Sequence, residues 1–306
     1  MPRSSLILKA IYYSSLAAPA RSACRPVMSS AASSSPPSDH LTAPPAGTSA
    51  YYALQRCPLP QRAALTALLQ AHSQIRGIVT TVSDAAVAQA KLTWWEGQLH
   101  ALSAGAAQHP ALRHLAPALQ AKGLGGDALL AVVRSVRIDL QQNRWLDRPA
   151  LLHYAQQCSG FTTRAAAALL GLDAAPAQDA AFDLGVALRL ASGIRHLGRD
   201  AAQGRIYLPL DALQRHGVTA AQLQQRRMDG AVQALLAEQT ALACDMLESA
   251  LAGLRTHPAR QTAPLRALGA MSLALLREIA RADYAVLHQR ISLTPLRKLW
   301  ISRTYR

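Results

Sequence analysis

Hydrophobic residues recur at intervals of three and four along most of the chain after residue 50, as in helices with one buried face. Between residues 60 and 80 this face carries Leu65, Leu68 and Ile75. The same reasoning predicts further helices, separated by Gly, Pro or Asn, at 87–102, 110–121, 127–140, 148–170, 178–197, 220–255 and 264–290. Either Ser83 or Asp84 is expected to cap the second helix. Since no alternating pattern of strand length occurs, we expect an all-α protein, a single helical bundle with a central cavity.

The N-terminal segment has a different composition from the rest of the chain. Residues 1–38 contain four basic residues, many serines and no acidic residue, which is typical of an organelle transit peptide. Two alternatives explain the same composition: a translation start assigned too early, ahead of Met28, or a disordered Ser/Ala/Pro-rich tail. We therefore divide the chain into residues 1–48, a flexible tail or transit peptide, and residues 49–306, a helical domain.

Composition narrows the class of protein. Half of the 306 residues are hydrophobic, which excludes a disordered chain, and the net charge of +15 comes from only 16% charged residues. This surface is too sparsely charged to favour nucleic-acid binding. The four cysteines suit neither a zinc site nor a disulfide framework, and no apolar stretch reaches membrane-spanning length. We expect a cytoplasmic protein, at most peripheral at the inner membrane, or a mitochondrial matrix protein if residues 1–38 are a transit peptide.

Several short stretches occur together in an order and spacing that are diagnostic. They are SAYY at 49–52, KLTWW at 91–95, DLG at 183–185, GRIYLP at 204–209 and QRISLTPLRKLW at 289–300. In these stretches the chain resembles the squalene/phytoene synthases, and most closely the bacterial presqualene diphosphate synthase branch of hopanoid biosynthesis. The resemblance implies an isoprenoid-synthase fold in which two prenyl diphosphates are joined head to head in an apolar tunnel. It also implies two Asp-rich motifs that hold Mg²⁺ against the diphosphates.

The chain departs from the family at both Asp-rich motifs. The first motif is occupied by Arg76, Gly77 and Thr80, and the second by His196, Arg199 and Asp200. Unit charges a few ångströms apart interact by about 4 kcal/mol at the effective dielectric of such a site, so these replacements would repel a magnesium cluster. We expect no metal cofactor. If activity remains, Mg²⁺ is the expected cofactor.

The resemblance also assigns candidate contacts. Residual metal ligands would be Asp139 and Asp200, and Tyr51, Tyr52, Arg195, Arg205 and Tyr207 occupy positions that contact substrate or close the cavity in the family. For the three tyrosines the favoured alternative is a core position with the hydroxyl in water. One hypothesis is a converted site, in which arginines including Arg76, Arg195, Arg199 and Arg205, together with His196, bind a diphosphate directly. The alternative is drift after the loss of catalysis, with Arg76 and Arg199 simply solvated. His72, alone on an apolar helix face, is expected to be a packed core residue and not a metal ligand.

Three functions are compatible with these residues. The first is a degenerate squalene/phytoene-synthase-like protein that binds a prenyl diphosphate, another anionic ligand or a partner synthase without a magnesium cluster. The second is a mitochondrial complex I assembly factor, because the assembly factor of this family also lacks intact Asp motifs. The third is an active head-to-head farnesyl diphosphate transferase with unconventional ligands.

The last segment has a pattern of its own. Residues 290–306 interleave basic residues with Leu293, Leu296, Leu299 and Trp300, as in helices that lie on anionic membrane surfaces. A final helix docked on the domain, with its basic face in water, explains the same pattern. Both interpretations predict a helix here.

Overall fold

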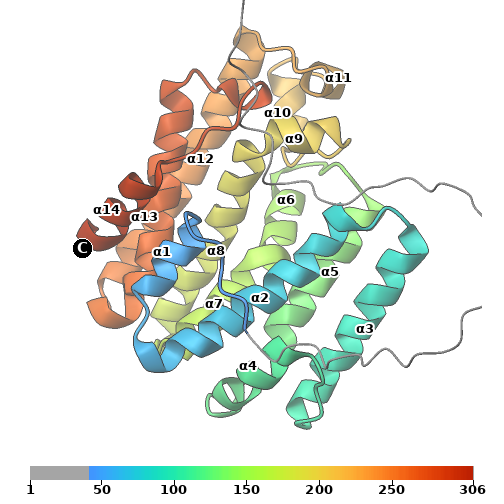
Figure 1. Cartoon of the computed structure of the whole chain (residues 1–306). Coiled ribbons are helices and arrows are strands. Elements are labelled where there is room, and N and C mark those ends of the chain that lie inside the picture. The colour runs from blue at the N-terminus through green and yellow to red at the C-terminus, as the bar shows by residue number, and fades with distance from the viewer. Residues whose placement is uncertain (1–40, 306) are drawn as a thin grey trace, which may run out of the picture. The chain divides into compact units, whose positions relative to one another are not determined.

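The computed structural model describes residues 41–305, which form fourteen α-helices. They are α1 (Ser49–Gln55), α2 (Leu59–Thr81), α3 (Ala85–Ser103), α4 (Pro110–Gln120), α5 (Asp127–Gln141), α6 (Arg148–Ala155), α7 (Phe161–Leu169), α8 (Ala175–Arg195), α9 (Leu197–Ala202), α10 (Leu210–Arg215), α11 (Ala220–Gln224), α12 (Gly230–Arg255), α13 (Ala259–Arg281) and α14 (Pro295–Thr304), with a π-helical turn η1 (Gln156–Gly160) and a 3-10 turn η2 (Ala285–Leu287). No strand forms within residues 41–305, where the only β-type pairing is an isolated bridge between Trp145 and Pro209. The all-α prediction is confirmed (Figure 1).

The prediction for the N-terminal segment concerns residues that are mostly outside this range. Residues 1–38, which carry the transit-peptide hypothesis, lie outside the described residues. Residues 41–48 precede α1 and contact the helical domain. The backbone N–H of Thr42 donates to Gln70 Oε1 at 3.0 Å, and Lys298 Nζ donates to the Gly47 carbonyl at 2.7 Å.

The helix starts follow local capping chemistry. Asp84, one of the two expected caps, accepts hydrogen bonds from the backbone N–H groups of Ala86 and Val87 at 2.7 and 3.0 Å. Asp147 accepts from the Ala150 N–H at the start of α6, and Thr294 accepts from the first turn of α14. These side chains satisfy N–H groups that have no partner inside a helix.

Three expected helices differ from the structure. The segment 148–170 is not one helix, because the π-helical turn η1 separates α6 from α7. The segment 220–255 is divided into α11 and α12, and Arg226 between them has a left-handed φ of 56° that no helix continues through. The helix expected at 264–290 begins earlier, at Ala259, because Pro258 already supplies the proline at the helix entrance. It ends at Arg281, since Asp283 and Tyr284 adopt left-handed φ angles of 50° and 57°.

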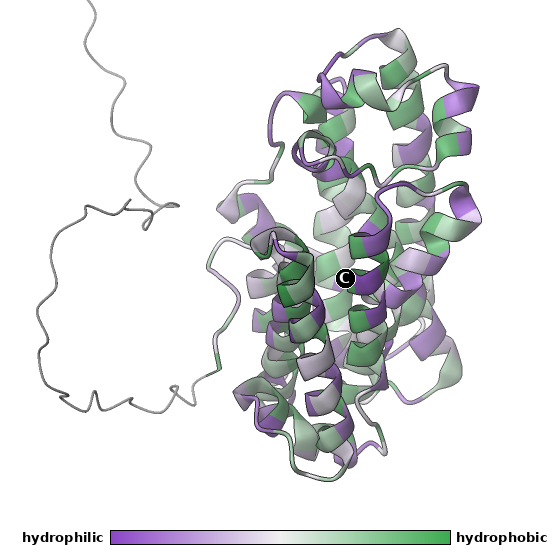
Figure 2. Ribbon diagram, turned by 90° about the vertical axis from the view of Figure 1, so that its right-hand side faces the viewer, coloured by the Kyte–Doolittle hydropathy of each residue, from purple (hydrophilic) through white to green (hydrophobic). Residues whose placement is uncertain are grey.

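One continuous apolar core joins helices from α1 to α14. Its largest fully buried side chains include Trp145, Tyr154, Leu68 and Ile75. Helix α8 is central, because it packs against α12, α7, α13, α6 and η1. Figure 2 shows hydrophobic and hydrophilic segments interleaved within single helices, as expected for helices that bury one face.

Two glycines allow the close approaches that position the rest of the molecule. A Cβ on Gly185 of α8 would lie 2.6 Å from the Ser159 carbonyl oxygen, so only glycine lets α8 approach η1 this closely. A Cβ on Gly198 of α9 would lie 2.6 Å from the Val286 carbonyl oxygen and 2.7 Å from that of Leu287. Gly198 therefore fixes the backbone around η2 against α9.

We predict that Gly198→Ala destabilises the protein by about 1–3 kcal/mol, because the new methyl group meets backbone oxygens that cannot move aside. Gly97→Ala is the matched control. It places a methyl group on the exposed side of α3 with no atom within 4 Å, and should stabilise the protein by up to about 1 kcal/mol. Urea unfolding followed by circular dichroism measures both. Equal effects of the two substitutions would contradict the packing argument.

Candidate functional site

The two segments expected to correspond to the Asp-rich motifs meet at one cavity of about 330 Å³, here called the motif cavity. Its lining includes Arg76 and Thr80 of α2, His196 after α8, and Arg199 and Asp200 of α9. The other lining residues are His72, Ser73, Val79, Cys158, Ser159, Leu188, Arg189, Ser192, Gln203, Arg205 and Tyr207. Gly77 does not line it. Helix α8 packs against η1, and His72 of α2 bonds to the Cys158 carbonyl of the same turn, which brings the two motifs to one cavity.

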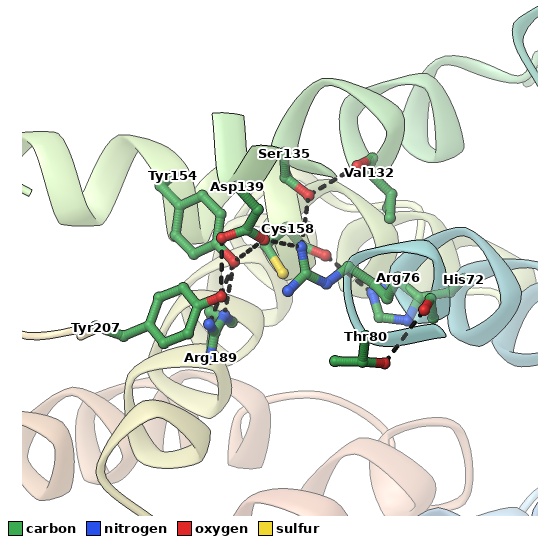
Figure 3. Close-up of polar contacts among 11 residues, drawn as sticks. His72, Arg76, Thr80, Val132, Ser135, Asp139, Tyr154, Cys158, Arg189 and Tyr207 are labelled. Atoms are coloured by element: carbon green, nitrogen blue, oxygen red, sulfur yellow. Dashed lines mark hydrogen bonds and ion pairs between the residues drawn. The ribbon is translucent and has the colours of Figure 1, made fainter. Parts of the chain in front are cut away.

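Asp139, a candidate metal ligand, is the acceptor at the centre of a buried polar network (Figure 3). Its side chain is 0% exposed. Oδ2 accepts from Arg76 Nη1 at 2.5 Å and from the Tyr154 hydroxyl at 2.8 Å, and Oδ1 accepts from the Tyr207 hydroxyl at 2.8 Å. The Arg76 side chain is only 18% exposed, so it is not simply solvated. It is ion-paired with Asp139, and its Nη1 lies 3.4 Å from Ser135 Oγ.

Three aromatic rings surround this network. Trp145, Tyr154 and Tyr207 have ring centroids 4.8 to 5.6 Å apart. The guanidinium of Arg189 lies 4.0 Å from the centroid of the Tyr207 ring and 5.2 Å from that of Tyr154, and it also donates to the Tyr154 hydroxyl. Burial is the main cause that raises the pKa of both tyrosines, so they act as neutral hydroxyl donors to Asp139.

The second candidate carboxylate is also paired. Asp200, buried at the end of the second motif, accepts from Nε and Nη2 of Arg199 at 2.9 and 2.7 Å. Arg205 lines the cavity beside it, and its backbone N–H donates to the Asp200 carbonyl at 2.8 Å. Four guanidiniums thus face one carboxylate among the lining residues of the motif cavity.

This set of side chains does not fit a magnesium cluster. Mg²⁺ requires several oxygen ligands in octahedral geometry, whereas Asp139 and Asp200 are each paired with an arginine. Within the described residues, no group of three or more His, Cys, Asp or Glu side chains is placed to hold a metal ion.

The two histidines of the cavity are neutral near pH 7. Burial lowers the pKa of His72 to about 4, and burial together with Arg199 and Arg195 lowers the pKa of His196 to about 4. His72 Nε2 lies 2.9 Å from the Cys158 carbonyl and His196 Nδ1 lies 3.0 Å from the Ser192 carbonyl. Because a carbonyl only accepts, each of these nitrogens carries its hydrogen. His72 is thus half-buried and lines the cavity, and it is not only a packing residue.

Two further cavities adjoin the same end of α8. The apolar cavity, about 140 Å³, lies between α8, α13, α1 and α14, and is lined by Ser49, Leu188, Ala191, Ser192, Arg195, Leu268, Met271, Ser272, Leu275, Leu293 and Lys298. The arginine cavity, about 440 Å³, includes Arg195, His196, Arg199, Arg226, His288 and Arg290 among its lining residues and no carboxylate. Arg195, expected with the second motif, therefore lines these two cavities and not the motif cavity.

Sequence reasoning placed some residues elsewhere and missed others. Tyr51 and Tyr52 of α1 pack edge to face, 5.3 Å apart, and line none of the three cavities. Tyr154 and Arg189 were missed, although both contact the network of Asp139. The sequence does contain a pattern that indicates Arg189. It lies seven residues before His196, which places both residues on the same helix face, and its neighbours in the sequence are apolar.

These features define a helical-bundle protein of the isoprenoid-synthase type, with a cavity between two motif-bearing helices. Among solved structures, a dehydrosqualene synthase in complex with a ligand is similar with a TM-score of 0.75 at 20% identity, covering 83% of this chain and 89% of that chain. A squalene synthase from Alicyclobacillus acidocaldarius is similar with a TM-score of 0.63 at 19% identity, covering 76% of this chain and 98% of the other. The likeness establishes the fold.

The sequence itself establishes the family. Residues 43–297 match the squalene/phytoene synthase family, and the chain belongs to it. Presqualene diphosphate synthase from Rhodopseudomonas palustris is 26% identical over 264 residues, 85% of this chain and 93% of that protein. Phytoene synthase from Thermus thermophilus is 32% identical over 161 residues, 53% of this chain and 55% of that protein. The family resemblance found in the sequence is confirmed.

A double-mutant cycle tests the ion pair at the centre of the site. We predict that Arg76→Met destabilises the protein by about 3 kcal/mol, because it leaves the buried Asp139 carboxylate without its counter-charge. Asp139→Asn should destabilise it similarly by leaving Arg76 unpaired. The double variant should lose clearly less than the sum of the two. The free energies of unfolding are measured by urea unfolding. If the losses of the two single variants add up to the loss of the double variant, Arg76 and Asp139 do not stabilise each other.

The neutral histidines predict a loss of stability in mild acid. In the unfolded chain imidazole takes up its proton near pH 6.5, whereas in the folded protein His72 and His196 do so near pH 4. Their contribution is therefore complete above pH 6.5 and is lost as the pH falls to about 4, by about 3 kcal/mol for each ring. The variant His72→Gln/His196→Gln should show a shallower fall over this window. An unchanged slope in thermal unfolding across the window would contradict these pKa values.

Proposed function

We propose that this protein binds a prenyl diphosphate through arginine side chains, without a magnesium cluster, and does not catalyse head-to-head condensation. The observation that carries the proposal is a cavity lined by Arg195, Arg226 and Arg290 without a carboxylate. The observation against a magnesium cluster is Arg76. It stands in the first motif and is ion-paired with Asp139, a carboxylate whose side chain is fully buried. The positive charge that metal ions supply to a diphosphate is replaced by guanidinium groups fixed in the protein.

The arginines around α8 and α9 have unused capacity for an anion. Arg195, Arg226 and Arg290 of the arginine cavity form no ion pair with a carboxylate in the part of the chain that the structure describes. Arg195 Nε is buried and has no hydrogen-bond partner there. Burial, with Arg290 and Arg199 nearby, lowers the pKa of Arg195, which shows that these cations repel one another. A bound phosphate group would relieve this repulsion and accept their hydrogen bonds.

The apolar cavity accounts for the lipid part of the ligand. Its walls carry Leu188 and Ala191 from α8 and Met271 and Leu275 from α13. Arg195 and Lys298 also line it, and Arg195 lines the arginine cavity as well. An apolar tail in the one cavity would thus be continuous with an anionic head in the other. A prenyl diphosphate combines an apolar tail with an anionic head in this way. One relative of this chain is a presqualene diphosphate synthase, whose name refers to a compound of this class.

The proposal predicts binding of farnesyl diphosphate with micromolar affinity in the presence of a metal chelator, measured by isothermal titration calorimetry. Arg195→Met and Arg290→Ala should each weaken binding about tenfold, since each removes one charged hydrogen-bond donor. Arg260→Ala is the matched control. It removes an exposed arginine that lines none of the three cavities, and should leave the affinity unchanged.

Two results would contradict the proposal. One is binding that requires Mg²⁺, which would mean that metal ions still bridge protein and diphosphate. The other is formation of a condensed product when the protein is incubated with labelled farnesyl diphosphate and Mg²⁺. In that case the third function considered from the sequence, an active transferase, would replace this one.

A further inference from the structure

Helix α14 presents large apolar side chains to solvent on a fixed surface. Leu296 is 78% exposed and Trp300 is 66% exposed. They lie one turn apart, and Arg303 continues the same side of the helix. The opposite side carries Lys298, Ile301 and Ser302, all buried against the domain. We call the outward side, Leu296, Trp300 and Arg303, the α14 face.

The exposure of this face is not a consequence of a loosely held helix. Helix α14 packs against α1 and α13. Its first turn is capped by Thr294, Lys298 Nζ is bonded to the Gly47 carbonyl at 2.7 Å, and Arg297 is ion-paired with Glu278 of α13. The helix is therefore held in one orientation, with Leu296 and Trp300 exposed to solvent.

The charges around the α14 face indicate what would cover it. Arg303 is exposed and forms no ion pair within residues 41–305, and the whole chain has a net charge of +15. A second copy of the chain would bring the same positive charges together, which disfavours self-association through this face. An anionic lipid surface instead attracts arginine and accepts Leu and Trp at the boundary between headgroups and acyl chains.

We propose that the α14 face docks the protein onto anionic membranes, with Leu296 and Trp300 inserted at the level of the headgroups and Arg303 contacting lipid phosphates. No helix of residues 41–305 is long and apolar enough to span a membrane, so the contact is interfacial. The other side of the same helix places Lys298 at the apolar cavity. A lipid-like ligand would therefore leave or enter the bilayer next to its cavity, although the docking itself does not depend on the proposed ligand.

The test is flotation of the full chain with vesicles of phosphatidylcholine that contain phosphatidylglycerol. The native protein should float with these vesicles at low salt, and less so as the salt concentration rises. Leu296→Ala/Trp300→Ala should reduce the partition coefficient at least about tenfold, and Arg303→Gln about fivefold. The matched controls are Leu146→Ala/Trp94→Ala and Lys91→Gln, which alter exposed residues elsewhere and should have no effect. Trp94 and Lys91 lie on α3, on the side of the bundle away from α14 (Figure 1).

Three outcomes would overturn the inference. They are no flotation of the native protein, equal flotation of the native protein and Leu296→Ala/Trp300→Ala, and a dimer in sedimentation velocity that this double variant abolishes. The last result would show that a second copy covers the face. Because the vesicles contain no prenyl diphosphate, and because calorimetry is carried out without lipid, failure of this inference and failure of the ligand proposal are separate results.

Discussion

The ion pair between Arg76 and Asp139 is the interaction on which the rest of the site depends. A carboxylate with a fully buried side chain is tolerated only with a counter-charge and hydrogen-bond donors. Arg76 supplies the charge, and the hydroxyls of Tyr154 and Tyr207 supply the remaining hydrogen bonds. The consequence is that Arg76 is held by a buried carboxylate, in a position where the family is expected to hold metal ions.

The same network links the fold to the site. Asp139 comes from α5, Arg76 from α2, Tyr154 from α6, Arg189 from α8 and Tyr207 from the loop before α10. These elements can meet because glycine at position 185 allows α8 to lie against the π-helical turn η1. The π-helical turn in turn carries Cys158, whose carbonyl accepts from His72. Cavity shape and charge are therefore consequences of one packing arrangement.

The basic side chains near the cavities fall into two groups, those that are ion-paired with a carboxylate and those that are not. Arg76 and Arg199 each have a carboxylate partner, whereas Arg195 and Lys298 have lowered pKa values because they are partly buried and near other cations. The sequence hypothesis of a converted anion site treated Arg76, Arg195, Arg199 and Arg205 as equivalent. The structure separates them: Arg76 and Arg199 are paired, Arg205 lines the motif cavity, and Arg195 lies with Arg226 and Arg290. The uncompensated group is the one with free capacity for a ligand.

The sequence alone determined the all-α class and the family, because helix periodicity and short motifs are local properties of the chain. It also predicted that Arg76, His196, Arg199 and Asp200 would lie near one another, since the two motifs face each other in the family. Only the tertiary structure decided that Asp139 is bound to Arg76, that Tyr154 and Arg189 belong to the site, and that Arg195 does not line the motif cavity. Pairing between buried groups depends on which helices approach one another and how closely. That is set by the packing of residues distant in sequence, such as Gly185 against Ser159, and not by local pattern.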